Sequence, residues 1–479
     1  MKTQTNHLPS TGNTHRMHSL ARQVLHYLNL YRTAGEKITP RWRQLTTSFF
    51  LRKAAWISIL LIFTHCQSLP EVEPATAPDK GTANARIASS VQTVTTMDGA
   101  ITQVNCKEEI LPSGEIIQIC IPALWNGELI LYAHGYVTEF EPLRLPQEAA
   151  AYIPLYTSLG FAFATTSFAQ NGLAIQSGIQ DIINLRSIFI KQYGQPKQIY
   201  LTGASQGGII TTLALERYPT LFSGGLSLCG PCGYFQGQIN YYGNFRVLFD
   251  YFFPGVLPGN AISFPDELIV NWDRVYVPAV IAAITQNPSA TLKLLRTAQA
   301  PYDPADPRTI AETVLGVLAY DVFNFRNAVR VLGGQPFDNR KYIYFGTGSI
   351  REDLQLNIRV KRFSADKTAL RTIKQYYETS GNLNRPLVTG HTTKDPIQLF
   401  WHLPLYQAKT VLQGKSSFFT PIPVQRYGHC TFTEAEIAAG FGLLLQKVKG
   451  QQPMLARVSD SQGKIVRKVS VEKRQGIEN

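Results

Sequence analysis

The stretch Gln198-Ile199-Tyr200-Leu201-Thr202-Gly203-Ala204-Ser205-Gln206-Gly207-Gly208 decides the fold class of this chain. Its first five residues predict a short buried strand, and helical character runs from about residue 207 to Arg217, before Pro219. Between the two, Gly203–Gly207 matches G-x-S-x-G, in which a serine occupies a strained turn from a strand into a helix. Small residues flank such a serine because a Cβ there would collide with the neighbouring strand or helix. The stretch therefore predicts an exposed nucleophile, Ser205.

Strands and helices alternate on both sides of this turn. Apolar runs predict strands at 128–134, 161–166, 198–202 and 221–228, and a helical repeat of Ile and Leu predicts a helix at 173–193. Strands that alternate with helices are typical of a mainly parallel sheet covered by helices on both faces. We therefore expect an α/β fold.

The composition supports a large folded core and argues against nucleic acid as a partner. Hydrophobic residues make up 44% of the 479 residues and charged residues only 16%. The formal net charge of +13 comes from the two ends, because residues 66–446 carry equal numbers of basic and acidic side chains. The predicted folded region thus has no excess positive charge with which to follow a phosphate backbone.

The N-terminal region predicts export. Arg52-Lys53 precedes an apolar run at 54–64, which is too short to cross a bilayer as a helix and has the form of a secretory signal. Cys66 follows after His65, and this placement resembles a bacterial lipoprotein signal with a lipidated cysteine that attaches the protein to a membrane. The alternatives are a cleaved signal without lipid and a buried hydrophobic helix. We expect a periplasmic or cell-surface lipoprotein, or otherwise a secreted protein.

The chain divides into five parts by composition. Residues 1–66 form an N-terminal extension plus the signal or lipoprotein-type segment, 67–95 predict a flexible tether, and 451–479 predict a basic flexible tail. The catalytic core is expected at 96–232 and 341–450. Residues 233–340 break the alternation of strands and helices and are rich in aromatics, which predicts a helical cap insertion over the site.

A serine nucleophile needs a base, and histidines are scarce after the signal: His134, His391, His402 and His429. His429 lies in a loop after the segment Phe418–Val424 and before a helical stretch, where a base could reach over the sheet edge. His429 is therefore the first candidate. His391 and His402 are alternatives, and His134 is expected to shape a loop beside the site.

The base needs a carboxylate to orient it, and Asp395 is the first candidate. It lies in a turn after the predicted strand that begins near Arg385. Glu352, Asp353 and Asp366 are the alternatives. The chain order of serine, aspartate and histidine is the order of α/β-hydrolases, and it differs from the orders in chymotrypsin and subtilisin.

Cysteine use fits an oxidising compartment. Cys106 and Cys120 flank a predicted hairpin turn, so a disulfide between them is expected. Cys229-Gly230-Pro231-Cys232 has the letters of a redox motif, but it follows a strand in mid-chain, so redox activity is not expected. Cys430 is the candidate for a free thiol, unless it pairs with Cys229 or Cys232.

No cofactor or metal is expected. The sequence has no H-E-x-x-H, no G-x-x-x-x-G-K-[ST] and no dinucleotide fingerprint with the required strand-to-helix context, and its few histidines are scattered.

Residues 125 to 447 resemble the α/β-hydrolase superfamily. The matching pieces are His134-Gly135-Tyr136, Gly203–Gly207, the segment 386–396 and Gly428-His429. The finer pattern is similar to secreted bacterial esterase-like serine hydrolases. The resemblance implies that the backbone N–H groups of Tyr136 and Gln206 form the oxyanion hole. In feruloyl-esterase and tannase-like enzymes a cysteine before the nucleophile pairs with one after the histidine. Here Ala204 precedes the nucleophile, so that disulfide cannot form in the same way.

The sequence therefore predicts an exported serine hydrolase, most simply a carboxylic ester hydrolase acting on a small-molecule or polymeric ester through Ser205, His429 and Asp395. Two alternatives stay open. One is a peptidase resembling the prolyl-oligopeptidase branch, and the other is a non-catalytic, surface-anchored binding protein on a hydrolase scaffold.

Overall fold

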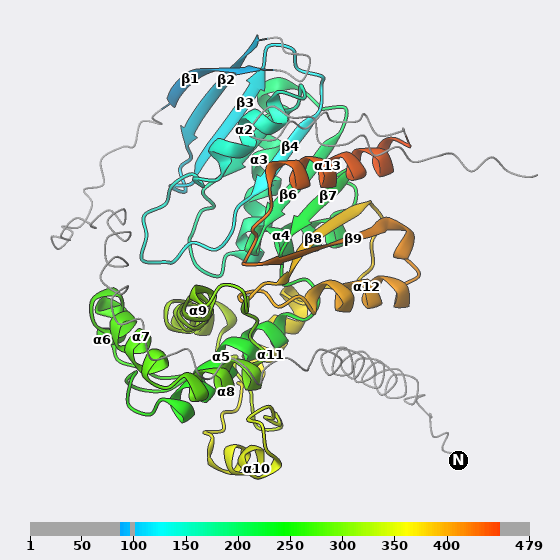
Figure 1. Ribbon diagram of the computed structural model, residues 1–479. Helices are drawn as coiled ribbons and strands as arrows, with labels where there is room; N and C mark the ends of the chain where they lie inside the picture. The colour runs from blue at the N-terminus through cyan, green and yellow to red at the C-terminus, as the bar shows by residue number, and fades with distance from the viewer. Residues whose placement is uncertain (1–86, 96–100, 451–479) are drawn as a thin grey trace, which may run out of the picture. The chain divides into compact units, whose positions relative to one another are not determined.

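The computed structural model describes residues 87–95 and 101–450 (Figure 1). The signal-type segment, Cys66, residues 67–86 of the expected tether and the basic tail lie outside these described residues. Within them, no helix is long and apolar enough to cross a membrane.

The described strands form one nine-stranded sheet in the order β1-β2-β3-β5-β4-β6-β7-β8-β9. At one edge β1 (Ile87–Thr95), β2 (Ile101–Ile110) and β3 (Ile116–Pro122) pair antiparallel, and β3 pairs antiparallel with β5 (Ala162–Thr166). All further pairings are parallel, and they join β5, β4 (Leu129–Ala133), β6 (Ile199–Ala204), β7 (Gly224–Leu228), β8 (Leu387–Lys394) and β9 (Phe419–Tyr427).

The first strand corrects the expected tether. Residues 67–95 were expected to be flexible throughout because they are rich in small and polar residues. Their last nine residues instead form β1, which pairs with β2 along its whole length. The strand carries Val91 and Val94 among Ser, Thr and Gln, and Val94 is buried. β-Branched residues favour an edge strand even where few apolar side chains are present.

Helices cover both faces of the sheet. In β4, Leu129, Leu131 and Ala133 belong to one apolar cluster, and the alternate residues Ile130 and Tyr132 belong to another. The first cluster includes α3 (Ile175–Tyr193), α4 (Gln206–Arg217) and α12 (His402–Leu412), and the second includes α2 (Ala149–Thr157) and α13 (Glu434–Lys449). This alternation is the period of two that a strand buried on both faces requires. The architecture confirms the predicted α/β-hydrolase fold.

Between β7 and β8, which are neighbours in the sheet, the chain forms a layer of helices. It consists of α5 (Phe235–Phe252), α6 (Asp266–Val270), the π-helix η2 (Trp272–Tyr276), α7 (Val277–Gln286), α8 (Pro288–Ala298), α9 (Arg308–Leu332), α10 (Ile350–Arg359) and α11 (Lys367–Tyr376). Figure 1 shows these helices gathered at one end of the sheet. Most of them share a separate apolar cluster, in which Phe245 and Phe249 are fully buried. Leu356 and Val360 belong to this cluster too, so the layer continues past residue 340.

The hairpin between β2 and β3 holds a buried acid, Glu115, whose side chain accepts a hydrogen bond from Thr166 Oγ1. Burial raises the pKa of Glu115 to about 7, the Thr166 hydrogen bond lowers it, and Asp181 raises it. Between pH 4.5 and 7 the folded protein therefore holds a proton that the unfolded chain has lost. As the pH rises through this window, the folded state loses stability.

We expect Glu115→Gln to remove this contribution. The free energy of unfolding of the variant, relative to the wild type, should rise by about 3 kcal/mol between pH 4.5 and 8. Urea unfolding of both proteins across this range measures the difference. Two curves that run parallel over the whole range would contradict the assignment.

Candidate active site

Ser205 occupies a sharp turn between β6 and α4. Its backbone has φ 55° and ψ −120°, in the left-handed half of conformational space that costs a serine free energy. The turn is held because the Ser205 N–H donates to the carbonyl of Leu228, at 2.8 Å. A Cβ on Gly207 would lie 1.8 Å from the carbonyl oxygen of Ala133, and one on Gly203 would lie 2.3 Å from that of Gly207. The glycines of the motif are therefore required by close backbone approach.

His429 lies in the loop after β9, and its Nε2 is 2.9 Å from Ser205 Oγ. The preceding Gly428 has φ 109°, a conformation that favours glycine. Its carbonyl accepts a hydrogen bond from Thr392 Oγ1 in β8, at 2.6 Å, which attaches the loop to the neighbouring strand. The imidazole is thus directed at the serine by a turn that is fixed to the sheet.

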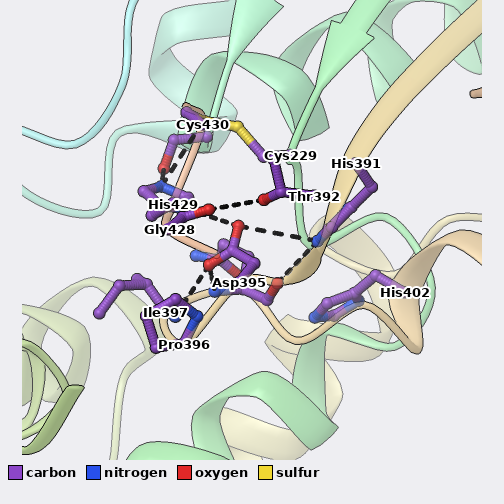
Figure 2. A network of polar contacts seen from close by, with 12 residues as sticks. Cys229, His391, Thr392, Asp395, Pro396, Ile397, His402, Gly428, His429 and Cys430 are labelled. Atoms are coloured by element: carbon purple, nitrogen blue, oxygen red, sulfur yellow. Dashed lines mark hydrogen bonds and ion pairs between the residues drawn. A yellow bond between two sulfur atoms is a disulfide. The ribbon is translucent and has the colours of Figure 1, made fainter. Parts of the chain in front are cut away.

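Asp395 follows β8 and lies beside His429 (Figure 2). Its Oδ2 is 2.8 Å from His429 Nδ1, and its Oδ1 accepts the backbone N–H groups of Ile397 and Gln398, each at 2.9 Å. The side chain is fully buried. With three donors around it, the carboxylate is held in one orientation and accepts a hydrogen bond from the N–H at His429 Nδ1. This leaves Nε2 free to accept the hydrogen bond of the serine hydroxyl.

The structure therefore brings together the three residues named from the sequence, although 224 positions separate Ser205 from His429. They come from the loops after β6, β8 and β9, at the edge where the carboxyl ends of parallel strands meet.

The other histidines hold structural positions. His391 is buried, its Nε2 donates to the carbonyl of Gln398 at 2.7 Å, and burial lowers its pKa. His402 Nδ1 accepts the N–H groups of Gly233 and Tyr234, at 3.1 and 3.3 Å, and burial lowers its pKa well below the usual value. Neither contacts Ser205, so the two alternative bases are set aside.

His134 stacks on Phe168 with ring centroids 4.0 Å apart, and burial lowers its pKa. Its Nδ1 donates to the carbonyl of Gly135, at 2.7 Å, inside the loop that leads to Tyr136. This is the loop-shaping position expected from the sequence.

The alternative acids lie away from the triad. Glu352 pairs with Lys293, Asp353 accepts the backbone N–H groups of Gly346 and Thr347, and Asp366 accepts that of Gln335. All three carboxylates are engaged in the helical layer.

Two disulfides are present among the described residues. Cys106–Cys120 joins β2 to β3 as expected, with a Cα–Cα distance of 4.0 Å. Cys229–Cys430 joins the end of β7 to the residue after His429, with a Cα–Cα distance of 5.5 Å (Figure 2). Cys430 is therefore not the free thiol, and the alternative named from the sequence, a pairing with Cys229, is confirmed, because the loops after β7 and β9 meet beside the triad. Within 87–95 and 101–450 the free cysteine is Cys232, which is buried and whose pKa burial raises to about 11.

We expect the Cys229–Cys430 disulfide to hold His429 in place. It closes a separation of 201 residues, for which the chain-entropy relation gives roughly 5 kcal/mol. Replacing both cysteines by serine should lower kcat more than it raises KM, since the base loses its support. The matched control is Cys106→Ser with Cys120→Ser, a pair far from the loop that carries the base. Equal kcat losses in the two double variants, measured on folded protein, would contradict this role.

The two residues expected as oxyanion donors, Tyr136 and Gln206, both line the cavity that contains Ser205. Gln206 is the first residue of α4, so its N–H has no acceptor within the helix and adds to the positive end of the helix dipole. The loop that carries Tyr136 is held because the Gly172 N–H donates to the carbonyl of Val137, at 2.8 Å. Their role as donors remains a prediction.

The cavity beside Ser205 has a volume of about 70 Å³ and is mainly apolar. The helical layer supplies one wall through Phe235, Ile239 and Tyr242 of α5 and Tyr320, Asn324 and Ala328 of α9. Burial raises the pKa of Tyr320 to about 12, and the interaction of its hydroxyl with Ser205 partly offsets that rise. The sequence did not single out any of these residues. Their spacing in the sequence predicts that they share one face of a helix, but it does not predict whether that face lines a cavity or packs against another helix.

One group of side chains among the described residues has the spacing of a metal site: Cys229, His429 and Cys430. The two sulfur atoms are bonded to each other, and His429 Nε2 faces the serine hydroxyl. The chemistry of this donor set therefore does not fit a metal ion.

A scan against protein-family models finds no match, and a search of the curated proteins finds none. Among solved structures, feruloyl esterase B from Aspergillus oryzae is similar at 12% identity, with a TM-score of 0.40, 81% of this chain covered and 91% of that one. The rice cell wall degrading esterase LipA from Xanthomonas oryzae matches at 13% identity and a TM-score of 0.36, over 76% of this chain and 95% of that one.

An acylaminoacyl peptidase from Pyrococcus horikoshii is also similar, at 12% identity and a TM-score of 0.37, over 76% of this chain. This chain spans 42% of the peptidase's length. Identities and scores at this level do not carry an activity or a substrate from these proteins to this one.

Proposed function

We propose that the protein is a serine hydrolase that cleaves carboxylic esters through an acyl-enzyme. The observation that carries the proposal is the unbroken hydrogen-bonded series from Ser205 Oγ to His429 and on to Asp395, with contacts of 2.9 and 2.8 Å. A nucleophile, a base in reach of it and a carboxylate that orients the base are the parts that acyl transfer requires.

In this mechanism His429 Nε2 takes the proton of Ser205 as Oγ attacks the carbonyl carbon of the ester. Asp395 holds the imidazole in the required tautomer and stabilises its charged form. The backbone N–H groups of Gln206 and Tyr136 stabilise the oxyanion of the tetrahedral intermediate. His429 then protonates the leaving alcohol, and water repeats the sequence on the acyl-enzyme.

The helical layer is proposed to act as a cap. Its helices α5 and α9 form one wall of the cavity at Ser205, which would limit the size of the bound group and exclude water during acyl transfer. The small apolar cavity favours an ester with a short acyl group over an extended peptide, so the peptidase is the second candidate.

Export is proposed on the two disulfides, which persist in oxidising compartments. Attachment to a membrane through a lipidated Cys66 remains a prediction from the sequence.

The proposal is tested by hydrolysis of p-nitrophenyl esters of rising acyl length by the full chain, with labelling by a fluorophosphonate probe beside it. We expect turnover that falls steeply beyond short acyl chains, and labelling at Ser205 that stops esterase activity. Labelling without ester cleavage, together with cleavage of peptide amides, would favour the peptidase. A folded protein with neither labelling nor turnover would favour a binding protein on a hydrolase scaffold.

A further inference from the structure

A buried residue, Asp321, lines a second cavity beside the one that contains Ser205. This second cavity has a volume of about 30 Å³, and it shares Ile239, Tyr242, Tyr320, Asn324 and Ala328 with the first. Because five residues line both, the two cavities adjoin, and Ser205 lines only the first. The triad and the proposed mechanism make no use of Asp321.

Helix α9 presents one face to both cavities. Tyr320, Asn324 and Ala328 follow each other at intervals of four residues, which places them on one side of the helix. Asp321 precedes Asn324 by three positions and lines only the second cavity. The helix thus lines both cavities with Tyr320 and Asn324 and the second cavity also with Asp321.

Three buried oxygen atoms around these cavities have no hydrogen-bond partner among the described residues: Asp321 Oδ2, Asn324 Oδ1 and Gln398 Oε1. Asp321 is 3% exposed and Gln398 is 6% exposed. A buried polar atom without a partner costs free energy, so such atoms indicate a group that approaches from the cavity. An approaching group must donate hydrogen bonds to satisfy a carboxylate oxygen.

One charged side chain lies near Asp321: Arg246, whose Nη1 also has no hydrogen-bond partner among the described residues. The buried guanidinium of Arg246 donates from Nε to Asp250 at 2.8 Å and from Nη2 to the carbonyl of Pro258 at 2.9 Å, and its Nη1 is 3.9 Å from Asp321. One positive charge therefore faces two carboxylates, and the closer one is Asp250. Burial raises the pKa of Asp321 to about 8, and Arg246 lowers it. In either protonation state the Asp321 side chain retains an acceptor oxygen for a ligand.

The size of the cavities limits the group that fits. An apolar cavity of about 150 Å³ holds one benzene molecule. The cavities of about 70 and 30 Å³ here are together smaller than that. They fit a chain of a few carbon atoms better than a ring.

We propose that these joined cavities bind the acyl part of the substrate and select short acyl groups that carry a hydrogen-bond donor, a hydroxyl or an amine, which Asp321 accepts. This inference rests on the proposed function. It adds a substrate class, esters of short hydroxy or amino acids, and a residue that determines specificity.

Three esters of equal length test the selection: ethyl butyrate, ethyl 3-hydroxybutyrate and ethyl 3-aminobutyrate. We expect kcat/KM to be at least about tenfold higher for one or both substituted esters, because a site built around a hydrogen bond rejects an analogue without the donor. A preference for the hydroxyl or for the amine identifies which donor the pocket takes. Equal values for all three esters would overturn the proposal.

Substitutions at Asp321 test the residue. Asp321→Leu should bring kcat/KM for the two substituted esters down to the value for ethyl butyrate, and Asp321→Asn, which keeps an acceptor oxygen, should retain part of the preference. The matched control is Asp250→Asn, which removes the other carboxylate of Arg246 and lines neither cavity. It should leave the ratio of kcat/KM values unchanged. A preference that survives in folded Asp321→Leu protein would overturn the role of this residue.

A binding measurement separates the two proposals. Calorimetric titration with 3-hydroxybutyramide, 3-aminobutyramide and butyramide needs no catalysis. If no ester is cleaved but a donor-bearing amide binds more tightly than butyramide, the proposed esterase function is wrong, and the proposed preference of the cavities for a donor-bearing group is supported. If esters are cleaved without a preference and the three amides bind equally, the proposed selectivity of the cavities is wrong, and the proposed esterase function is supported.

Discussion

Ser205→Ala is expected to lower kcat for ester hydrolysis by at least about 10⁴-fold while the protein stays folded. The serine hydroxyl is the only group among the described residues that lies 2.9 Å from His429 Nε2 and opens on the cavity. Without it, no acyl-enzyme forms, and only the weaker effects of binding and oxyanion stabilisation remain. Stability should change little, because the Ser205 side chain caps no helix and a methyl group fits its place.

Initial rates on a short p-nitrophenyl ester measure the loss, and thermal unfolding checks the fold. Ser187→Ala is the matched control, since Ser187 lies on the exposed side of α3 and donates only to the carbonyl of Ile183. It should retain full activity. If Ser205→Ala is folded and retains more than a tenth of the wild-type kcat, the nucleophile is misassigned.

Much of this site could be predicted because its positions are fixed by local backbone constraints. The glycines around Ser205 identify a strand-to-helix turn, and a parallel sheet brings the loops after its strands to one edge. A carboxylate in the loop after β8 and a histidine in the loop after β9 must then lie near the serine. Asp395 and His429 satisfy this condition, and their contacts in the structure follow from it.

The cysteine pairing could not be predicted because it depends on tertiary structure alone. Cys229 and Cys232 are both close to the end of β7, and only the path of the loop decides which of them meets Cys430. The structure buries Cys229 in one apolar cluster, where Cys430 reaches it, and places Cys232 in another, with its thiol close to Thr212 and Ser227.

The pocket residues were missed for a similar reason. The helical layer is apolar on several sides, so the aromatic residues of α5 and α9 could equally have formed its own core. Phe245 and Phe249 do so, whereas Tyr242 and Tyr320 stack on each other at the cavity, with ring centroids 5.2 Å apart. An acid among the apolar residues of a helix, such as Asp321, was the one available signal, since a charged side chain is rarely buried unless it has a partner.

The packing of the nucleophile turn predicts a large effect on stability, at Gly207→Ala. The added Cβ would lie 1.8 Å from the carbonyl oxygen of Ala133, 2.6 Å from its carbon and 2.8 Å from the carbonyl oxygen of His134. These are backbone atoms of β4 and the loop after it, so they cannot move aside as a side chain can. Separation of α4 from β4 should cost more than about 3 kcal/mol, a large share of the stability of a typical domain. It should also displace Ser205 and the loop that carries Tyr136.

Gly442→Ala provides the matched control, because Gly442 lies inside α13 and a Cβ there meets nothing within 4 Å. Replacement of a glycine in a helix interior by alanine should raise the free energy of unfolding by about 0.5–1 kcal/mol. The two variants change the same atoms and should shift the melting temperature in opposite directions. A Gly207→Ala protein that melts with the wild type would mean that α4 and β4 do not approach this closely. The strained geometry assigned to Ser205 would then lose its physical basis, since it is this approach that forces the turn.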